Sequence, residues 1–325
     1  MMFTNLEPER QARTLEKLKR EMGETVLAAL QDDFTQEVQL NPDGQLWTEH
    51  FVTGRSKLGH MDSVMAHNLL GTIADILGVV VNPENPLLEG ELPIRDCRFA
   101  GAIPPIVLAP AFSIRTPATK VYTFRDYVAA GIMTEDQAET IRAATIAGKA
   151  ILVVGGTGSG KTTLLNAIAA ALHAEMPDIR FMVIEDTREL QLPFENKVQL
   201  RTKVTGNQIS MKRLLEFSLR MKPDRIVVGE VRNEAAASLI EAWNTGHDGG
   251  MGTVHANDAE AGALRMVDLL RHAGIPADVA MRQIANTIDL IVSIQKRHHE
   301  GGKRRVEEIV RVDGVKHGEF VFSPA

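Results

Sequence analysis

The clearest chemical pattern in the sequence runs from Gly155 to Thr162 and reads Gly-Gly-Thr-Gly-Ser-Gly-Lys-Thr. It fits G-x-x-x-x-G-K-[ST], in which glycines let main-chain N–H groups wrap around phosphate oxygens. In this pattern Lys161 reaches the β- and γ-phosphates, and the Thr162 hydroxyl is a ligand of Mg²⁺. An apolar strand precedes the loop and a helical run follows it, as the pattern requires. The predicted ATP-binding residues are Gly155, Gly156, Thr157, Gly158, Ser159, Gly160, Lys161, Thr162 and Thr163.

A carboxylate follows a second apolar run. Ile226–Gly229 is typical of a buried strand, and Glu230 comes directly after it. A glutamate at that edge can orient water or a metal-bound water beside a phosphate site. Taken alone, the pattern also fits a surface glutamate at the end of a strand.

Two other polar clusters also follow apolar runs. The segment 185–189 reads Glu-Asp-Thr-Arg-Glu and places four charges after a strand. Carboxylates at the carboxyl edge of a parallel sheet lie where ligands bind, although a solvated loop would have the same composition. His255 ends a short glycine-led strand, and from the residues alone it is either structural or catalytic. His298 and His299 have no metal-ligand spacing, so we expect them at the surface.

The elements that position these residues are short strands alternating with helices, which predicts βαβ units and a mostly parallel sheet. A capping-box pattern at 134–137 opens a first helix that extends to about 147. A closing hairpin is expected from runs 288–295 and 305–310. The expected strands are 150–154, 181–184, 225–228 and 252–254, and the expected helices begin near Lys161, Ser210, Asn233 and Asp258.

The first third of the chain has a different organisation. Residues 1–117 hold 10 Lys and Arg against 16 Asp and Glu, so the whole net charge of −6 falls here and the remainder is balanced. Helical spacing is clear at 7–31, with Gly23 as its weak point, and at 61–77. A hairpin is expected at 37–52 across Asn41–Gly44, and strands at 95–102 and 111–115. We therefore expect an N-terminal α+β domain at 1–117, a linker at 118–128 and a second domain at 129–325.

Composition excludes several classes of protein. Aromatic residues make up 5% of the chain, too few for a surface that stacks many bases. The pI of about 6.0 gives no bulk basic field, so we expect no direct nucleic-acid binding. The single cysteine, Cys97, rules out a disulfide framework and a four-cysteine zinc site.

The sequence predicts a cytoplasmic location. The first ten residues include Glu7, Glu9 and Arg10 and have no apolar region of a secretory signal. The longest apolar stretches fall short of the roughly 18 residues that a membrane-spanning helix needs. This pattern is compatible with peripheral attachment to a membrane through a partner.

Four motifs in fixed order resemble the type II/type IV secretion traffic ATPase superfamily. They are the loop GGTGSGKTT (155–163), the acidic box IEDTREL (184–190), RMKPDRIVVGEVR (220–232) and the histidine box GGMGTVHAND (249–258). The segments NPDGQLWTEH (41–50) and FSIRTP (112–117) resemble its conjugal-transfer branch, the TrbB-type ATPases of type IV secretion systems. The resemblance covers nearly the whole chain and is most specific over 150–258.

This resemblance implies an α/β fold, with a RecA-like P-loop NTPase domain joined to a smaller N-terminal α+β domain. It also implies a homohexamer that hydrolyses ATP with Mg²⁺, binds the nucleotide between its domains and works with inner-membrane secretion components. Without the cysteines, the zinc module of the pilus-assembly branch is absent from this sequence.

The resemblance also implies roles for individual residues. Glu185 and Asp186 would assist the metal and water, with Asp186 and Thr162 nearest Mg²⁺. Glu230 would be the Walker B carboxylate and His255 a sensor of the γ-phosphate. Arg115 would cover the nucleotide from the N-terminal domain, and Arg220 and Arg232 are further arginine contacts.

The leading hypothesis is an ATPase that energises type IV secretion during conjugation. A type IV pilus retraction or assembly motor is the alternative within the superfamily, and neighbouring genes would separate the two. A nucleotide-gated scaffold without significant turnover is an alternative of another class. A helicase is disfavoured by the neutral second part and the scarce aromatic residues.

Overall fold

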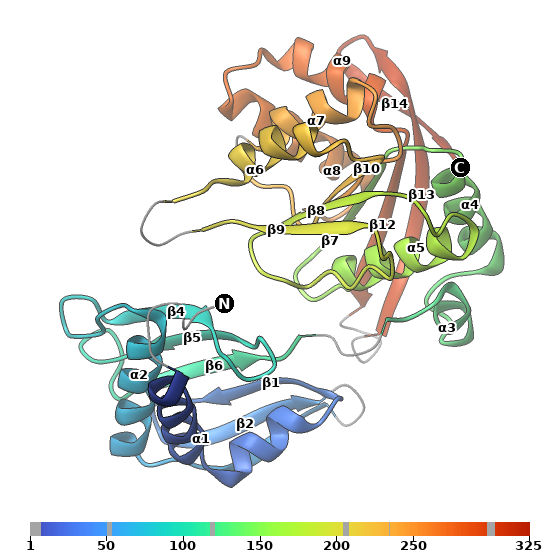
Figure 1. Ribbon diagram of the computed structural model, residues 1–325. Coiled ribbons are helices and arrows are strands. Elements are labelled where there is room, and N and C mark those ends of the chain that lie inside the picture. The colour runs from blue at the N-terminus through green and yellow to red at the C-terminus, as the bar shows by residue number, and fades with distance from the viewer. Residues whose placement is uncertain (1–7, 51–53, 118–120, 204–207, 234, 298–302) are drawn as a thin grey trace. The chain divides into compact units, whose positions relative to one another are not determined.

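The computed structural model describes residues 8–50, 54–117, 121–203, 208–233, 235–297 and 303–325. The chain divides into two compact units, Met1–Thr119 and Lys120–Ala325, which are described separately (Figure 1).

The first unit is a sheet with two helices. Its six strands follow the order β3-β2-β1-β6-β5-β4, and each neighbouring pair is antiparallel. The elements are α1 (Pro8–Gln31), β1 (Thr35–Leu40), β2 (Gln45–His50), β3 (Gly54–His60), α2 (Ser63–Leu77), β4 (Leu87–Glu91), β5 (Arg98–Ala102) and β6 (Ala111–Arg115).

The core of the first unit lies between the helices and the sheet. Leu18, Leu69 and Ile114, from α1, α2 and β6, are fully buried in one cluster. Gly23 interrupts α1 with a φ of 75°, which confirms the predicted weak point. Cys97 is also in this core, and burial raises the pKa of its thiol to about 11. Strands β3 and β4 were not predicted, and residues 51 and 52 of the expected hairpin lie outside the described residues.

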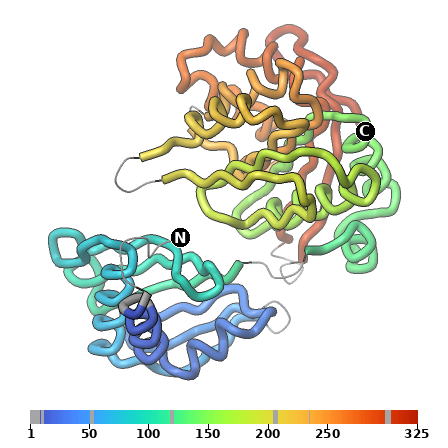
Figure 2. The backbone as a smooth tube through the Cα atoms, in the orientation of Figure 1, coloured from blue at the N-terminus to red at the C-terminus, as the bar shows by residue number. Residues whose placement is uncertain are grey.

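The second unit is built on one eight-stranded sheet, in the order β14-β13-β12-β7-β11-β10-β8-β9. The six strands from β12 to β9 are parallel, while β13 and β14 are antiparallel additions. The last two strands, red in Figure 2, form one edge of this sheet. The strands are β7 (Ile151–Gly155), β8 (Phe181–Glu185), β9 (Lys197–Arg201), β10 (Arg225–Val228), β11 (Met251–His255), β12 (Leu290–Arg297), β13 (Lys303–Lys316) and β14 (Glu319–Pro324).

Helices cover both faces of this sheet and give three layers (Figure 1). Successive residues of β7 face opposite cores: Leu152 packs with α6 to α9, and Val153 packs with α3 to α5. This two-sided burial explains why the strands are continuous apolar runs. The helices are α3 (Phe124–Ala129), α4 (Glu135–Ile146), α5 (Lys161–Glu175), α6 (Met211–Ser218), α7 (Ala235–Asn244), α8 (Ala259–His272) and α9 (Ala277–Thr287).

Most element predictions for this unit are confirmed, and the differences have physical causes. The capping box opens α4, with Thr134 and Gln137 bonded to each other's main chain. Strands β9 and β14 and helix α9 were not predicted. Residues 124–128, which we assigned to a linker, lie in α3, and Tyr127 is buried in the second unit's core. Residues 118–120 of that linker and His298 and His299 lie outside the described part of the chain.

Candidate active site

The glycine-rich loop joins the carboxyl end of β7 to the first turn of α5. Gly158 and Gly160 have φ values of 70° and 97°, which residues with a Cβ rarely adopt. Gly160 is the N-cap of α5 and supplies no side-chain cap, so the first N–H groups of the helix are left for a ligand. Thr157 is exposed, and Thr162 and Thr163 are half-buried. The loop therefore has the backbone geometry of a phosphate cradle.

Strands from the end of the chain hold this loop in place. Gln295 of β12 accepts a hydrogen bond from the Gly156 N–H at 3.4 Å. Arg304 of β13 donates from Nε to the Gly158 carbonyl at 3.3 Å. Sequence reasoning missed both residues, because their distance of about 140 positions from the loop gives no local signal.

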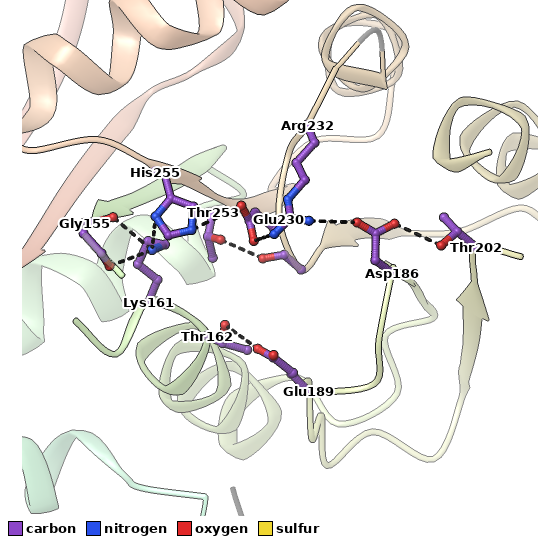
Figure 3. A network of polar contacts seen from close by, with 12 residues as sticks. Gly155, Lys161, Thr162, Asp186, Glu189, Thr202, Glu230, Arg232, Thr253 and His255 are labelled. Carbon is purple, nitrogen blue, oxygen red and sulfur yellow. Dashed lines mark hydrogen bonds and ion pairs between the residues drawn. The ribbon is translucent and has the colours of Figure 1, made fainter. Parts of the chain in front are cut away.

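Lys161 is folded back onto its own loop. Its Nζ donates to the carbonyl oxygens of Gly155 and Gly156, both at 2.9 Å, and lies 3.2 Å from Nδ1 of His255 (Figure 3). The side chain is only 8% exposed. Because an ammonium group is a donor only, Nδ1 must accept, which places the proton of a neutral ring on Nε2.

His255 connects the loop to the end of β10. Its Nε2 lies 3.3 Å from Oε1 of Glu230, completing a contact chain from Lys161 to that carboxylate. Burial and then the charge of Lys161 lower the pKa of His255, against an opposing effect of Glu230. The ring is therefore held neutral in a position between a cation and an anion.

Glu230 is clamped by an arginine two residues later. Nη2 of Arg232 donates to Oε2 of Glu230 at 2.6 Å. Burial raises the pKa of Glu230, but the hydrogen bond and charge of Arg232, with the charge of Lys161, outweigh burial and lower it overall. The carboxylate is therefore ionised at neutral pH.

Three carboxylates, Glu185, Asp186 and Glu189, lie at the end of β8 and in the segment after it, and each has a different environment. Glu185 is 3% exposed and accepts the N–H groups of Glu189 and Leu190 at 2.9 and 2.8 Å, so it fixes the turn that follows the strand. Asp186 is exposed, accepts the Thr202 hydroxyl at 3.0 Å and lies 3.6 Å from Nη1 of Arg232.

Glu189 is the carboxylate that contacts α5, the helix that follows the glycine-rich loop. It accepts the Thr162 hydroxyl at 3.1 Å (Figure 3). Asn166 of α5 supports the same segment through Gln191 and the Glu189 carbonyl. The sequence placed Asp186 beside Thr162, whereas the structure brings Glu189 to that hydroxyl. The sequence named Glu189 only as part of the charged segment 185–189 and did not name Asn166, because motif spacing does not show which side chains face one another.

The two other arginines predicted for the site are exposed, and they belong to different units of the chain. Arg115 is exposed at the end of β6 in the first unit. Arg220 is exposed on the 3-10 turn Leu219–Met221 after α6. Of the two predicted arginines in the second unit, Arg232 joins the described contacts around the phosphate loop and Arg220 does not.

The loop, its lysine, and the polar side chains at the carboxyl ends of β7, β8, β10 and β11 define a P-loop NTPase, with the site at the edge where parallel sheets bind ligands. The family profile described as "Type II/IV secretion system protein" matches residues 82–309, and the chain belongs to that family. Its 41% identity to a conjugal transfer protein over 95% of the chain makes it a member of the type IV secretion and conjugation traffic ATPase family, with a RecA-like domain and a smaller N-terminal domain.

Similar proteins agree with this assignment. The chain is 41% identical to the conjugal transfer protein TrbB of Rhizobium radiobacter over 95% of its length and 93% of the relative. It is 29% identical to the protein VirB11 of Agrobacterium fabrum, covering 91% and 94% of the two chains. The crystal structure of the pilus retraction motor PilT with bound ADP has the same fold, with a TM-score of 0.58 at 18% identity, covering 89% of this chain and 78% of that one.

Across the residues that the structure describes, no helix has the length and apolar character needed to cross a membrane.

Proposed function

We propose that this protein is an ATPase that hydrolyses ATP to ADP and phosphate and energises type IV secretion during conjugative DNA transfer. The observation that carries the proposal is the contact chain from the P-loop Lys161 through His255 to Glu230. It joins the group that binds phosphates to a carboxylate that can orient water, within one site. The high identity to TrbB supports the conjugative role.

The first step is the binding of the triphosphate. Lys161 leaves the carbonyl oxygens of its own loop and takes phosphate oxygens as acceptors instead. The first N–H groups of α5 face the same anion. Because His255 is bonded to Lys161, this movement also frees Nδ1 of His255 to respond to the γ-phosphate.

Glu230 is the residue proposed to position the attacking water. Its low pKa keeps it ionised, and an ionised carboxylate accepts a hydrogen bond from water and aims the oxygen. Glu185 has both N–H partners in the turn after β8, so its contribution is to hold that turn and the Glu189 side chain in place. Arg115 is the proposed arginine contact from the first unit.

The site also fits Mg²⁺. The Thr162 hydroxyl and the Glu189 carboxylate lie together at the start of α5, and oxygen donors of this type are what Mg²⁺ prefers. When bound with ATP, Mg²⁺ neutralises charge on the phosphates. Thr162 and Glu189 would hold it, with Asp186 a neighbouring carboxylate on the same segment.

The assembly proposed is a homohexamer in the cytoplasm that attaches to inner-membrane components of the secretion system. It needs no direct contact with nucleic acid. A pilus retraction or assembly motor is the alternative: PilT shares the fold, but a likeness at 18% identity concerns the fold alone. A scaffold that binds nucleotide without turnover is the alternative of another class.

Turnover of purified protein with Mg²⁺ and ATP tests the proposal. We expect phosphate release that Lys161→Ala abolishes and that the matched variant Lys149→Ala retains, because Lys149 is half-exposed and paired with Asp289. Nucleotide binding without turnover would favour the scaffold. Neighbouring genes for a relaxase and mating pore, with loss of plasmid transfer on deletion, would separate conjugation from a pilus role.

A further inference from the structure

Arg232 faces three carboxylates that come from two strand ends. It donates to Glu230 at 2.6 Å and lies 3.6 Å from Asp186. Glu189, which accepts the Thr162 hydroxyl, also acts on it electrostatically. A single guanidinium group therefore holds together the acidic residues that follow β10 and β8 (Figure 3).

The local fold fixes this arrangement within one chain. Val231, between Glu230 and Arg232, is buried, and its N–H donates to the Thr253 carbonyl of β11 at 2.8 Å. The Gly229 N–H donates to the Ile184 carbonyl of β8 at 3.0 Å, which holds the ends of β10 and β8 side by side. Arg232 thus bridges two neighbouring strand ends of its own sheet.

Removing this cation would leave like charges together beside the phosphate loop. Glu230 and Asp186 are 26% and 38% exposed in their side chains, so water screens them only in part. A triphosphate brings more negative charge to this region than a diphosphate. The carboxylates would therefore disfavour ATP more than ADP if Arg232 did not balance them.

We propose that Arg232 acts within its own subunit as a positioning residue, which pairs with Glu230 and Asp186 and thereby lets the site accept a γ-phosphate. It is not an arginine supplied to the nucleotide of a neighbouring subunit. This inference rests on the proposed nucleotide binding, and it adds a residue that makes the site prefer ATP to ADP.

Calorimetric titration of the full-length protein with ATPγS and with ADP, each with Mg²⁺, tests this role. We expect Arg232→Gln to weaken ATPγS binding about tenfold more than ADP binding, a coupling usual for charged groups in contact. Arg232→Lys, which keeps the charge, recovers part of the loss. The matched control is Arg213→Gln, because Arg213 pairs with Glu216 on an exposed face of α6; it leaves both affinities unchanged.

A second substitution makes the charge argument specific. Adding Asp186→Asn to Arg232→Gln removes one of the unbalanced carboxylates, so we expect most of the ATPγS affinity to return. A merely structural role for Arg232 would not be repaired by removing a carboxylate. Equal losses for ATPγS and ADP, or no recovery in the double variant, would overturn the proposal. Absence of binding to the unmodified protein would instead overturn the proposed function.

Mixed assemblies separate action within a subunit from action between subunits. Lys161→Ala and Arg232→Gln chains carry different affinity tags, are produced together and are purified through both tags. If Arg232 serves its own subunit, the mixture at a low ATP concentration keeps only the reduced turnover of its Arg232→Gln chains. If it served a neighbour, random mixing would place an intact P-loop beside an intact arginine in about a quarter of the interfaces of a ring, and recovered turnover of that order would refute the proposal.

Discussion

The two sheets of this chain handle polar side chains differently. In the six-stranded sheet every neighbouring pair is antiparallel, so successive strands end at opposite edges. In the eight-stranded sheet six parallel strands end at one edge, and Lys161, Glu230 and His255 meet there. Converging strand ends concentrate charge at one place, and this is where catalysis can be assembled. The comparison predicts that substitutions in the first sheet act on stability and those at the parallel edge act on turnover.

The largest contrast should come from two glutamates. Glu230→Gln removes the ionised carboxylate at the parallel edge, and we expect turnover to fall about a hundredfold to a thousandfold with ATP binding retained. Glu89→Gln changes an exposed carboxylate of β4 in the antiparallel sheet and should leave turnover unchanged. Steady-state phosphate release measures both. A Glu230→Gln variant with full turnover would contradict the prediction that residues at the parallel edge act on turnover.

Two leucines test whether the cores are separate. Leu69 of α2 and Leu165 of α5 are fully buried in the first and second units. Each change to alanine should cost about 2–5 kcal/mol in the free energy of unfolding of its own unit. Hydrogen exchange read by mass spectrometry should show the loss around the substituted helix, with ADP protecting the phosphate loop of the second unit. Equal loss in both units from either variant would contradict this.

Substitution of Glu185 tests whether a carboxylate at the parallel edge is structural, in contrast with Glu230, which we expect to be catalytic. Glu185→Ala leaves the buried Leu190 N–H without its acceptor, at a cost of about 1–3 kcal/mol. Glu185→Gln keeps an amide oxygen that can accept it, so it should be close to the unmodified protein in both stability and turnover. Chemical denaturation and phosphate release measure the pair. Loss of turnover in a stable Glu185→Gln protein would show that the charge itself takes part in the chemistry.

The smallest effect concerns pH. Because the pKa of His255 is lowered in the folded protein, the unfolded chain takes up this proton first as pH falls below the ordinary value of 6.5. The folded state should therefore be less stable at pH below about 6.5 than above it, and His255→Asn should flatten this part of the profile. In NMR titrations, Lys161→Met should move the His255 pKa upward, because the neighbouring charge is gone. An unchanged pKa would contradict the contact.

The sequence predicted the elements whose own residues are buried, because burial gives those residues a recognisable apolar pattern. Strand β10 was found because all four of its residues are buried. Strand β3 was missed because its residues are mostly exposed, and β9 because it lies at the sheet edge and is half-buried throughout. Edge strands owe their existence to a partner strand, and that information is not local.

The site was predicted as a set of motifs, but the division of tasks within it was not. Glu185 and Asp186 are adjacent, yet one is buried in main-chain hydrogen bonds and the other is paired with Arg232. The hydrogen bond from the Thr162 hydroxyl to Glu189 depends on the turn that Glu185 holds in place. Motif spacing locates such residues near one another, and only the path of the loop decides which of them touch.

The bracing of the P-loop by Gln295 and Arg304 has a consequence for protein synthesis. Strand β7 needs β11 on one side and β12 on the other, and β12 leaves the ribosome about 140 residues after the loop. While the chain is still growing, the phosphate cradle has its complete sequence but lacks a neighbouring strand and two of its supports. The nucleotide binding that we propose therefore becomes available only after β12 has been synthesised and can pair with β7.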